Sequence, residues 1–237
     1  MFIIQGGNII NSKILNGAQL KIIAMITMLV DHFVKMILFQ YTQISRISLG
    51  IELMLILGRI AYPIFCFLLV EGFVHTRNRK RYLMNLLGFA LITEIPFNLL
   101  ISGSWQFPYY QNIWWTFSVA VIVLMGFEYC LSKRQWPYTL LAAVIVLAGC
   151  LVAYLGLVDY GYTAILTIVA LYYFHDRPIY GLLVGVFING DSLFASLGFL
   201  LCAIYIGQRG HLNKWIGYSF YPLHLLLLYF LQLYLFG

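Results

Sequence analysis

Long apolar runs separated by short polar segments dominate the chain. The runs lack the strict alternation of apolar and polar residues that a half-buried strand shows, so they favour helices. A helix needs about 20 apolar residues to cross a bilayer, and runs of this length predict transmembrane spans. The pattern predicts about nine spans, at residues 20–39, 50–74, 82–101, 112–131, 138–156, 160–174, 178–190, 192–207 and 216–236. The run at 178–190 is short, and we expect a partial helix there.

The composition excludes a soluble domain, a secreted disulfide scaffold and a disordered chain. Of the 237 residues, 62% are apolar and 9% are charged, whereas an ordinary globular protein has about 25% charged residues. At a mean hydropathy of +0.90, the chain has too few charged side chains to cover a water-facing surface. The expected fold class is therefore all-α, a polytopic transmembrane helical bundle that forms one integral membrane domain over residues 1–237.

The basic residues predict the orientation of the bundle, because short cytoplasmic loops carry an excess of lysine and arginine. With a cytoplasmic N-terminus, eleven of the 14 basic residues fall on the cytoplasmic side: Lys13, Lys21, Arg77, Arg79, Lys80, Arg81, Lys133, Arg134, Arg177, Arg209 and Lys214. We expect a multi-pass inner-membrane protein whose C-terminus, after nine spans, is external. The net charge of +6 follows from these loops and does not indicate nucleic acid. The first residues lack the features of a signal peptide.

Ionisable residues inside the predicted spans are the candidates for function. On insertion scales each costs about 2.5 kcal/mol or more, so such residues usually mark a polar interior or a pathway. Counting along each span from its predicted ends divides them into two layers. The middle-to-outer layer contains Asp31, His32, Arg59, Glu94 and Asp159, and the cytoplasmic layer contains Glu71, His75, Arg77, Tyr221 and His224.

Several of these residues also have purely structural interpretations. Asp31 and Lys35 are one helical turn apart and could pair with each other. Arg59 could form an ion pair with Glu94. His175 lies in a predicted loop and receives no role. The histidines have no HxxxH or HExxH spacing and no cysteine near them in the sequence, so we expect no metal site.

The chain resembles the TraX family, whose founding activity is N-acetylation of F-type conjugative pilin at the inner membrane. The similar stretches are residues 20–32, 58–83, 89–99, 111–117, 159–166 and 218–229. The run GRIAYPIFCFLLVEGFVHTRNRKRYL, at 58–83, is the most specific. The resemblance implicates Asp31, His32, Arg59, Glu71, His75, Arg77, Glu94, Asn112, Asp159, Tyr160, Tyr221 and His224. The family often carries an acidic residue where this chain has Asn98.

The resemblance implies acetyl transfer from a thioester, which needs a base, a site for the acyl donor and a hydrogen-bond donor for the oxyanion. We assign His32 as the base and Arg59 as the stabiliser of negative charge, with Asp31 and Glu94 completing the catalytic set. The neighbouring Asp31 points about 100° away from His32 on a helix. The partner that orients His32 is therefore expected to be Glu94 or Asp159.

Acetyl-CoA from the cytoplasm is the expected acyl donor, since its phosphates suit the basic run after the second span. The residues predicted to bind acetyl-CoA are Glu71, His75, Arg77, Arg79, Lys80, Arg81, Tyr221 and His224. Those predicted to bind the acceptor, a peptide N-terminus or another small exported molecule, are Asn98, Asn112, Asp159 and Tyr160. The basic run could equally contact lipid head groups. We favour direct transfer, with an acetyl-histidine on His32 or His75 as the alternative.

Two other classes of protein share parts of this pattern. A secondary transporter for a small polar solute also has broken helices and charges near the middle of the bilayer. Against it, the halves show no inverted repeat, and the charges concentrate in the first half of the chain. A structural assembly factor would need the buried charges only to pair with one another. The oligomeric state stays open.

Overall fold

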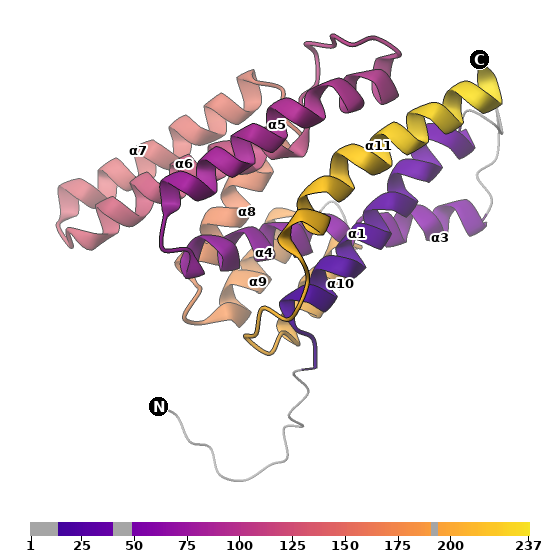
Figure 1. Ribbon diagram of the computed structural model, residues 1–237. Helices are drawn as coiled ribbons and strands as arrows, with labels where there is room; N and C mark the ends of the chain where they lie inside the picture. Colours follow the sequence, from indigo (N-terminus) through magenta and orange to yellow (C-terminus); the bar gives the residue numbers. More distant parts are fainter. Residues whose placement is uncertain (1–13, 40–48, 191–193) are drawn as a thin grey trace.

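The computed structural model describes residues 14–39, 49–190 and 194–237, and the regular elements in these ranges are helices (Figure 1). The all-α prediction is therefore confirmed for the described part of the chain. Lys13, counted above among the cytoplasmic charges, and residues 192 and 193 of the predicted span 192–207 lie outside the described residues.

The helices follow the predicted apolar runs in order. They are α1 (Gly17–Phe33), the π-helix η1 (Val34–Leu38), α3 (Leu49–Gly58), α4 (Ala61–His75), α5 (Arg79–Ser102), α6 (Ile113–Ser132), α7 (Trp136–Leu155), α8 (Gly161–Tyr173), α9 (Pro178–Ile188), α10 (Ala195–Ala203) and α11 (Lys214–Phe236). Asparagine caps begin several of them, because the side-chain oxygen accepts a hydrogen bond from an otherwise unpaired backbone N–H. Asn16 does this for α1, Asn78 for α5 and Asn112 for α6.

The predicted number of spans is larger than the structure supports. Among the described residues, five helical runs are long and apolar enough to cross a membrane: Leu49–His75, Arg79–Ser102, Ile113–Ser132, Trp136–Leu155 and Lys214–Phe236. Helices α8, α9 and α10 have only 13, 11 and 9 residues. At about 1.5 Å per residue they fall short of a hydrocarbon core about 30 Å thick. The chain is a multi-pass membrane protein, and the external C-terminus that followed from nine spans loses its basis.

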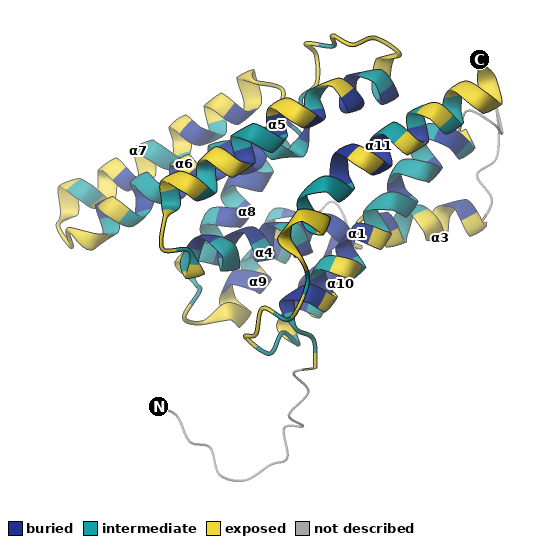
Figure 2. Cartoon of the chain, in the orientation of Figure 1, coloured by how far each residue is buried: buried dark blue, intermediate teal, exposed yellow. Residues whose placement is uncertain are grey.

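Helix α7 shows where the bundle meets lipid. In its most apolar stretch only 17% of the residues are buried inside the bundle. Leu140, Val144, Leu147, Leu151 and Leu155, spaced at three or four residues, are all exposed along one face, as Figure 2 shows for this helix. An exposed apolar stripe of this length is stable against acyl chains and unstable against water.

Close packing of α1 against the junction of α3 and α4 determines the geometry around Asp31. The helical run is interrupted at Arg59 and Ile60, between α3 and α4. Gly58 ends α3 directly against α1, where an added Cβ would lie 2.5 Å from Asp31 Oδ1. Only glycine allows this approach of the two helices. On the other side of α1, α11 packs along both α1 and α5.

Candidate active site

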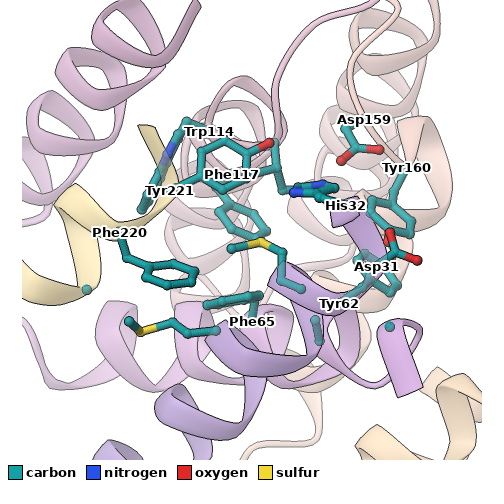
Figure 3. A pocket seen from close by; sticks show the side chains of 16 residues that line it. Asp31, His32, Tyr62, Phe65, Trp114, Phe117, Asp159, Tyr160, Phe220 and Tyr221 are labelled. Atoms are coloured by element: carbon teal, nitrogen blue, oxygen red, sulfur yellow. The ribbon is translucent and has the colours of Figure 1, made fainter. Parts of the chain in front are cut away.

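A pocket of about 630 Å³, including its open mouth, lies between α1, α4, α6 and α11 (Figure 3). The turn between α7 and α8 contributes to its wall. The lining residues are Met25, Met28, Asp31, His32, Gly58, Ala61, Tyr62, Phe65, Ile113, Trp114, Phe117, Asp159, Tyr160, Gly217, Phe220 and Tyr221. Figure 3 shows His32 and the two carboxylates toward one end of the pocket and Phe65 and Phe220 toward the other. The pocket thus has a polar end and an apolar end.

Two histidines from the first and last helices form a hydrogen-bonded pair at the polar end. His32 Nδ1 lies 2.8 Å from His224 Nε2. His224 Nδ1 lies 2.9 Å from the carbonyl oxygen of Phe220, one turn earlier in α11. A carbonyl only accepts, so the proton of neutral His224 is on Nδ1 and its Nε2 accepts. His32 therefore donates from Nδ1, which leaves its own Nε2 as an acceptor.

The pair corrects two sequence predictions. His224 orients His32, whereas Glu94 or Asp159 was expected in that role. Tyr221 and His224 were placed in a separate layer with Glu71 and His75, but both lie beside His32, with the rings of His32 and Tyr221 6.2 Å apart. With the described residues, His32 forms this one hydrogen bond, so Nε2 remains available to a substrate.

Asp31 supplies a carboxylate to the same end of the pocket. Its Oδ2 accepts a hydrogen bond from Lys35 Nζ, so the predicted i,i+4 pair is present. Its Oδ1 is buried against Gly58 and has no hydrogen-bond partner among the described residues. The helix changes to the π form at Val34, directly after this segment. Such π-segments are frequent at functional sites because they alter the direction of neighbouring side chains.

Asp159 supplies the second carboxylate, from the turn before α8. Tyr110 donates its hydroxyl proton to Asp159 Oδ1, and Thr116 Oγ1 donates to the Asp159 carbonyl at 2.7 Å. Burial raises the pKa of Asp159 to about 6, although the Tyr110 hydrogen bond opposes this. Tyr160 follows with a φ of 58°, in the left-handed region, and its ring stacks on Tyr62 with centroids 3.8 Å apart. Such a backbone conformation is costly for a residue other than glycine and is common at functional sites.

The predicted partners Arg59 and Glu94 are not together. Arg59 is exposed at the break between α3 and α4, and the ion pairs of the described residues do not include it. Glu94 Oε2 instead accepts hydrogen bonds from Asn112 Nδ2 at 2.6 Å and Trp115 Nε1 at 3.0 Å. The alternative of an Arg59–Glu94 ion pair is therefore wrong, and neither residue lines the pocket.

Two predicted acceptor-binding residues hold helices and loops together. Asn112 caps α6 through the Trp114 backbone N–H at 3.1 Å and donates to the Ala90 carbonyl at 3.0 Å. Asn98 Nδ2 donates to the Trp105 carbonyl at 3.2 Å. Both are buried outside the pocket, so acceptor binding by these two amides has no geometric support.

A second cluster lies at the far end of α4. His175 Nε2 lies 2.8 Å from Glu71 Oε1, and His75 Nδ1 lies 3.8 Å from Glu71 Oε2. The hydrogen bond to Glu71 raises the pKa of His175. His175 received no role from the sequence, because its position in a loop did not reveal that the chain returns to α4. Glu71, His75 and His175 are absent from the pocket wall.

In the basic run after α4, one residue forms an ion pair with a described residue and three do not. Arg79 forms an ion pair with Glu128 at 3.1 Å and lies 4.2 Å above the Phe73 ring. Arg77, Lys80 and Arg81 are exposed, and the ion pairs of the described ranges leave them out. All four residues lie outside the pocket wall. Their predicted role in binding acetyl-CoA stays a prediction.

Trp114 is a functional candidate that the sequence did not single out. It lines the pocket, and its indole Nε1 is buried without a hydrogen-bond partner among the described residues. A buried N–H donor without a partner is uncommon and usually has a reason. The one signal in the sequence was the tryptophan pair in QNIWWTF. Trp115 donates a hydrogen bond to Glu94, and Trp114 lines the pocket.

Comparison with known proteins gives one family and one relative. Residues 16–232 match the family model described as TraX protein. The chain is 29% identical, over 240 residues, to the probable fimbrial assembly protein FimC, serogroup H1, of Dichelobacter nodosus. That alignment covers 89% of this chain and 93% of the relative. No solved structure matches the chain.

Proposed function

Because the chain belongs to the TraX family, we propose that it is a membrane-embedded acetyltransferase that moves an acetyl group from acetyl-CoA to an amine. The name of the Dichelobacter relative refers to fimbrial assembly, which favours a pilin-like peptide N-terminus as the acceptor. The excess of basic residues in the loops favours an inner-membrane location with a cytoplasmic N-terminus, the side from which acetyl-CoA is supplied.

The observation that carries this proposal is the acceptor Nε2 of His32, which has no partner among the described residues and lies in a pocket with two carboxylates. His224 holds the His32 ring through the Nδ1 of His32. The basic nitrogen of His32, Nε2, is therefore left to face the pocket. A neutral imidazole with a free ring nitrogen can take a proton from an attacking amine, which is the role of a general base. A base whose ring is held by a third group is the usual arrangement for activating a nucleophile.

The proposed reaction is a direct transfer. The neutral amine attacks the carbonyl carbon of the thioester, a C–N bond forms, and His32 Nε2 takes the amine proton. The tetrahedral intermediate then collapses, the C–S bond breaks, and the same proton passes from His32 to the departing thiolate of CoA. An acetyl-histidine on His32 is the covalent alternative.

Two groups of the pocket suit the charges of this reaction. Asp31 and Asp159 at the polar end would attract the ammonium form of the acceptor before it loses a proton. The unpartnered Trp114 N–H would suit the negative oxygen that develops on the thioester carbonyl. Arg59, which the sequence suggested for this oxygen, is outside the pocket wall. The carboxylates favour an amine over a hydroxyl as the acceptor.

The test is acetyl transfer from labelled acetyl-CoA to a short peptide by the full chain in nanodiscs. A peptide with a free N-terminus should be acetylated, and the same peptide with a blocked N-terminus should not. His32→Gln should lower the rate by about 10²- to 10⁴-fold, the usual contribution of a general base. His211→Gln, an exposed histidine, is the matched control. A folded His32→Gln protein with the rate of the control would remove the proposed base.

The same experiment separates the enzyme from the other two classes. In liposomes of the same lipid composition as the nanodiscs, a transporter would move a solute across the bilayer without acetylating any peptide. An assembly factor would bind its partner equally well with His32→Gln. Transfer that depends on His32 and on a free amine is expected of the acetyltransferase alone.

A further inference from the structure

One face of α1 leads from the reacting end of the pocket to its mouth. Lys21, Met25, Met28 and His32 follow one another at spacings of three and four residues, so they lie on the same face of the helix. The last three line the pocket. Lys21 therefore lies one turn beyond the pocket wall, on the side away from His32.

The side chain of Lys21 runs along a glycine of the pocket wall. A Cβ added to Gly217 would lie 3.1 Å from Lys21 Cδ and 3.4 Å from Lys21 Nζ. Gly217 itself lines the pocket. The half-buried Lys21 ammonium thus lies at the rim of the pocket, where any larger residue at 217 would crowd it.

A second cation reaches the same rim from the loop before α11. Gly17 donates its backbone N–H to the Gln208 carbonyl at 2.8 Å, and the Arg209 carbonyl would lie 3.0 Å from a Cβ added to Gly17. Since Lys21 is one turn after Gly17, this contact brings Arg209 close to Lys21. Burial and the like charge of Arg209 both lower the pKa of Lys21.

Within the described part of the chain, these two cations have no acidic partner. The ion pairs of the described residues are Lys35–Asp31, His75–Glu71, Arg79–Glu128 and His175–Glu71. Two like charges close together raise the free energy of the folded protein, and water screens the half-buried Lys21 less than the exposed Arg209. A bound anion removes this repulsion, and phosphate groups bind well to a lysine and an arginine together.

The distance to His32 fits a particular class of anion. Eleven residues separate Lys21 from His32, which is about 16 Å along a helix. In CoA, about twelve chain bonds separate the diphosphate from the sulfur, and at about 3.5 Å per three bonds, as in extended peptide, they reach about 14 Å. Met25, Met28, Phe65 and Phe220 line the pocket between the two points and suit an uncharged arm.

We propose that Lys21 and Arg209 bind the diphosphate of the acyl donor at the mouth of the pocket. The pantetheine arm then runs along α1 and presents the thioester to His32. The inference rests on the proposed acetyltransferase function and gives the donor a binding site different from the basic run at Arg77–Arg81.

The test compares two double variants that lose the same charge. Lys21→Gln/Arg209→Gln removes the proposed site, and Lys133→Gln/Arg134→Gln removes two cations from the turn between α6 and α7. Binding of CoA is measured by calorimetry on the full chain in phosphatidylcholine nanodiscs. The first variant should raise the Kd for CoA about tenfold or more, as expected for lost charge-assisted hydrogen bonds, and the second should leave it within about twofold.

Acetyl-pantetheine, which lacks the diphosphate, provides a second readout. Both double variants should use it as a donor at the same rate, because the proposed site has nothing to bind. If the wild-type protein binds CoA and both variants match it, the inference is wrong and the acetyltransferase stands. If the wild type neither binds CoA nor accepts acetyl groups from either donor, the proposed function itself fails.

A lipid head group is the other source of phosphate at a membrane protein. Phosphatidylglycerol added to the nanodiscs should leave the difference in CoA affinity between the two variants unchanged. Loss of phosphatidylglycerol binding in Lys21→Gln/Arg209→Gln, with CoA binding retained, would assign the two cations to lipid and overturn the inference.

Discussion

Replacement of His224 by leucine removes the acceptor for the Nδ1 proton of His32. In the wild type this bond spans 2.8 Å between α1 and α11, and His224 is 4% exposed. Leucine fills a similar volume but offers no lone pair. The Nδ1–H of His32 is then buried without a partner whenever Nε2 is the free base.

The expected effect on transfer follows from that lost bond. A buried donor without a partner costs about 1–3 kcal/mol. The cost applies to the tautomer in which Nε2 is the base, and it disfavours that tautomer by about 5- to 150-fold. The rate of acetyl transfer by His224→Leu should fall by the same factor. His224→Gln should recover part of the rate, since its side-chain carbonyl accepts a hydrogen bond.

The assay is the pH profile of transfer by the full chain in nanodiscs. Because His224 acts through His32, its loss should change kcat and the pH dependence while leaving the Kd for CoA near the wild-type value. His211→Leu, at an exposed position, is the matched control. A folded His224→Leu protein with the kcat and the pH profile of the control would refute the role of the histidine pair.

Two further predictions concern stability. Gly58→Ala places a Cβ 2.5 Å from Asp31 Oδ1, so the free energy of unfolding, measured by thermal unfolding, should fall by about 1–3 kcal/mol. The control Gly88→Ala, whose added Cβ meets nothing within 4 Å, should show no such loss. Equal unfolding temperatures of the two variants would contradict the close approach of the helices. Burial raises the pKa of Asp159 from 3.8 to about 6, so between these values the folded protein holds a proton that the unfolded chain has lost, and stability falls as pH rises. Asp159→Asn should abolish this fall, and a wild-type unfolding temperature that is flat from pH 4 to pH 6 would contradict it.

The positions of the helices could be predicted from the sequence, because apolar runs are local. The predicted span 82–101 corresponds to α5, and 216–236 corresponds to α11. The number of spans was harder to predict, since an apolar run can be longer than the helix that forms within it. The run at 192–207 contains a helix of 9 residues, Ala195–Ala203, and among its other described residues, 194 and 204–207, none is helical.

The site was partly predictable for an equally physical reason. Asp31, His32 and Asp159 were selected because charge inside a membrane is costly, and all three line the pocket. Their partners depend on which helices touch, and helix contacts are not local. The sequence assigned His224 to the cytoplasmic layer. In the structure, α11 packs along α1 and this contact places His224 at the level of His32.

The distribution of charge along the pocket argues for transfer over passage or scaffolding. A scaffold would satisfy its buried polar groups, yet Asp31 Oδ1 and Trp114 Nε1 are buried without a hydrogen-bond partner among the described residues. The Nε2 of the half-buried His32 also forms no hydrogen bond with those residues. A pathway for one solute would favour charge of one sign throughout. Here two carboxylates lie at one end, two cations lie beyond the other, and the histidine lies by the carboxylates. In the proposed reaction, such opposite ends would bind two different molecules, an anionic carrier and a cationic acceptor, and would bring their reacting atoms together at one base.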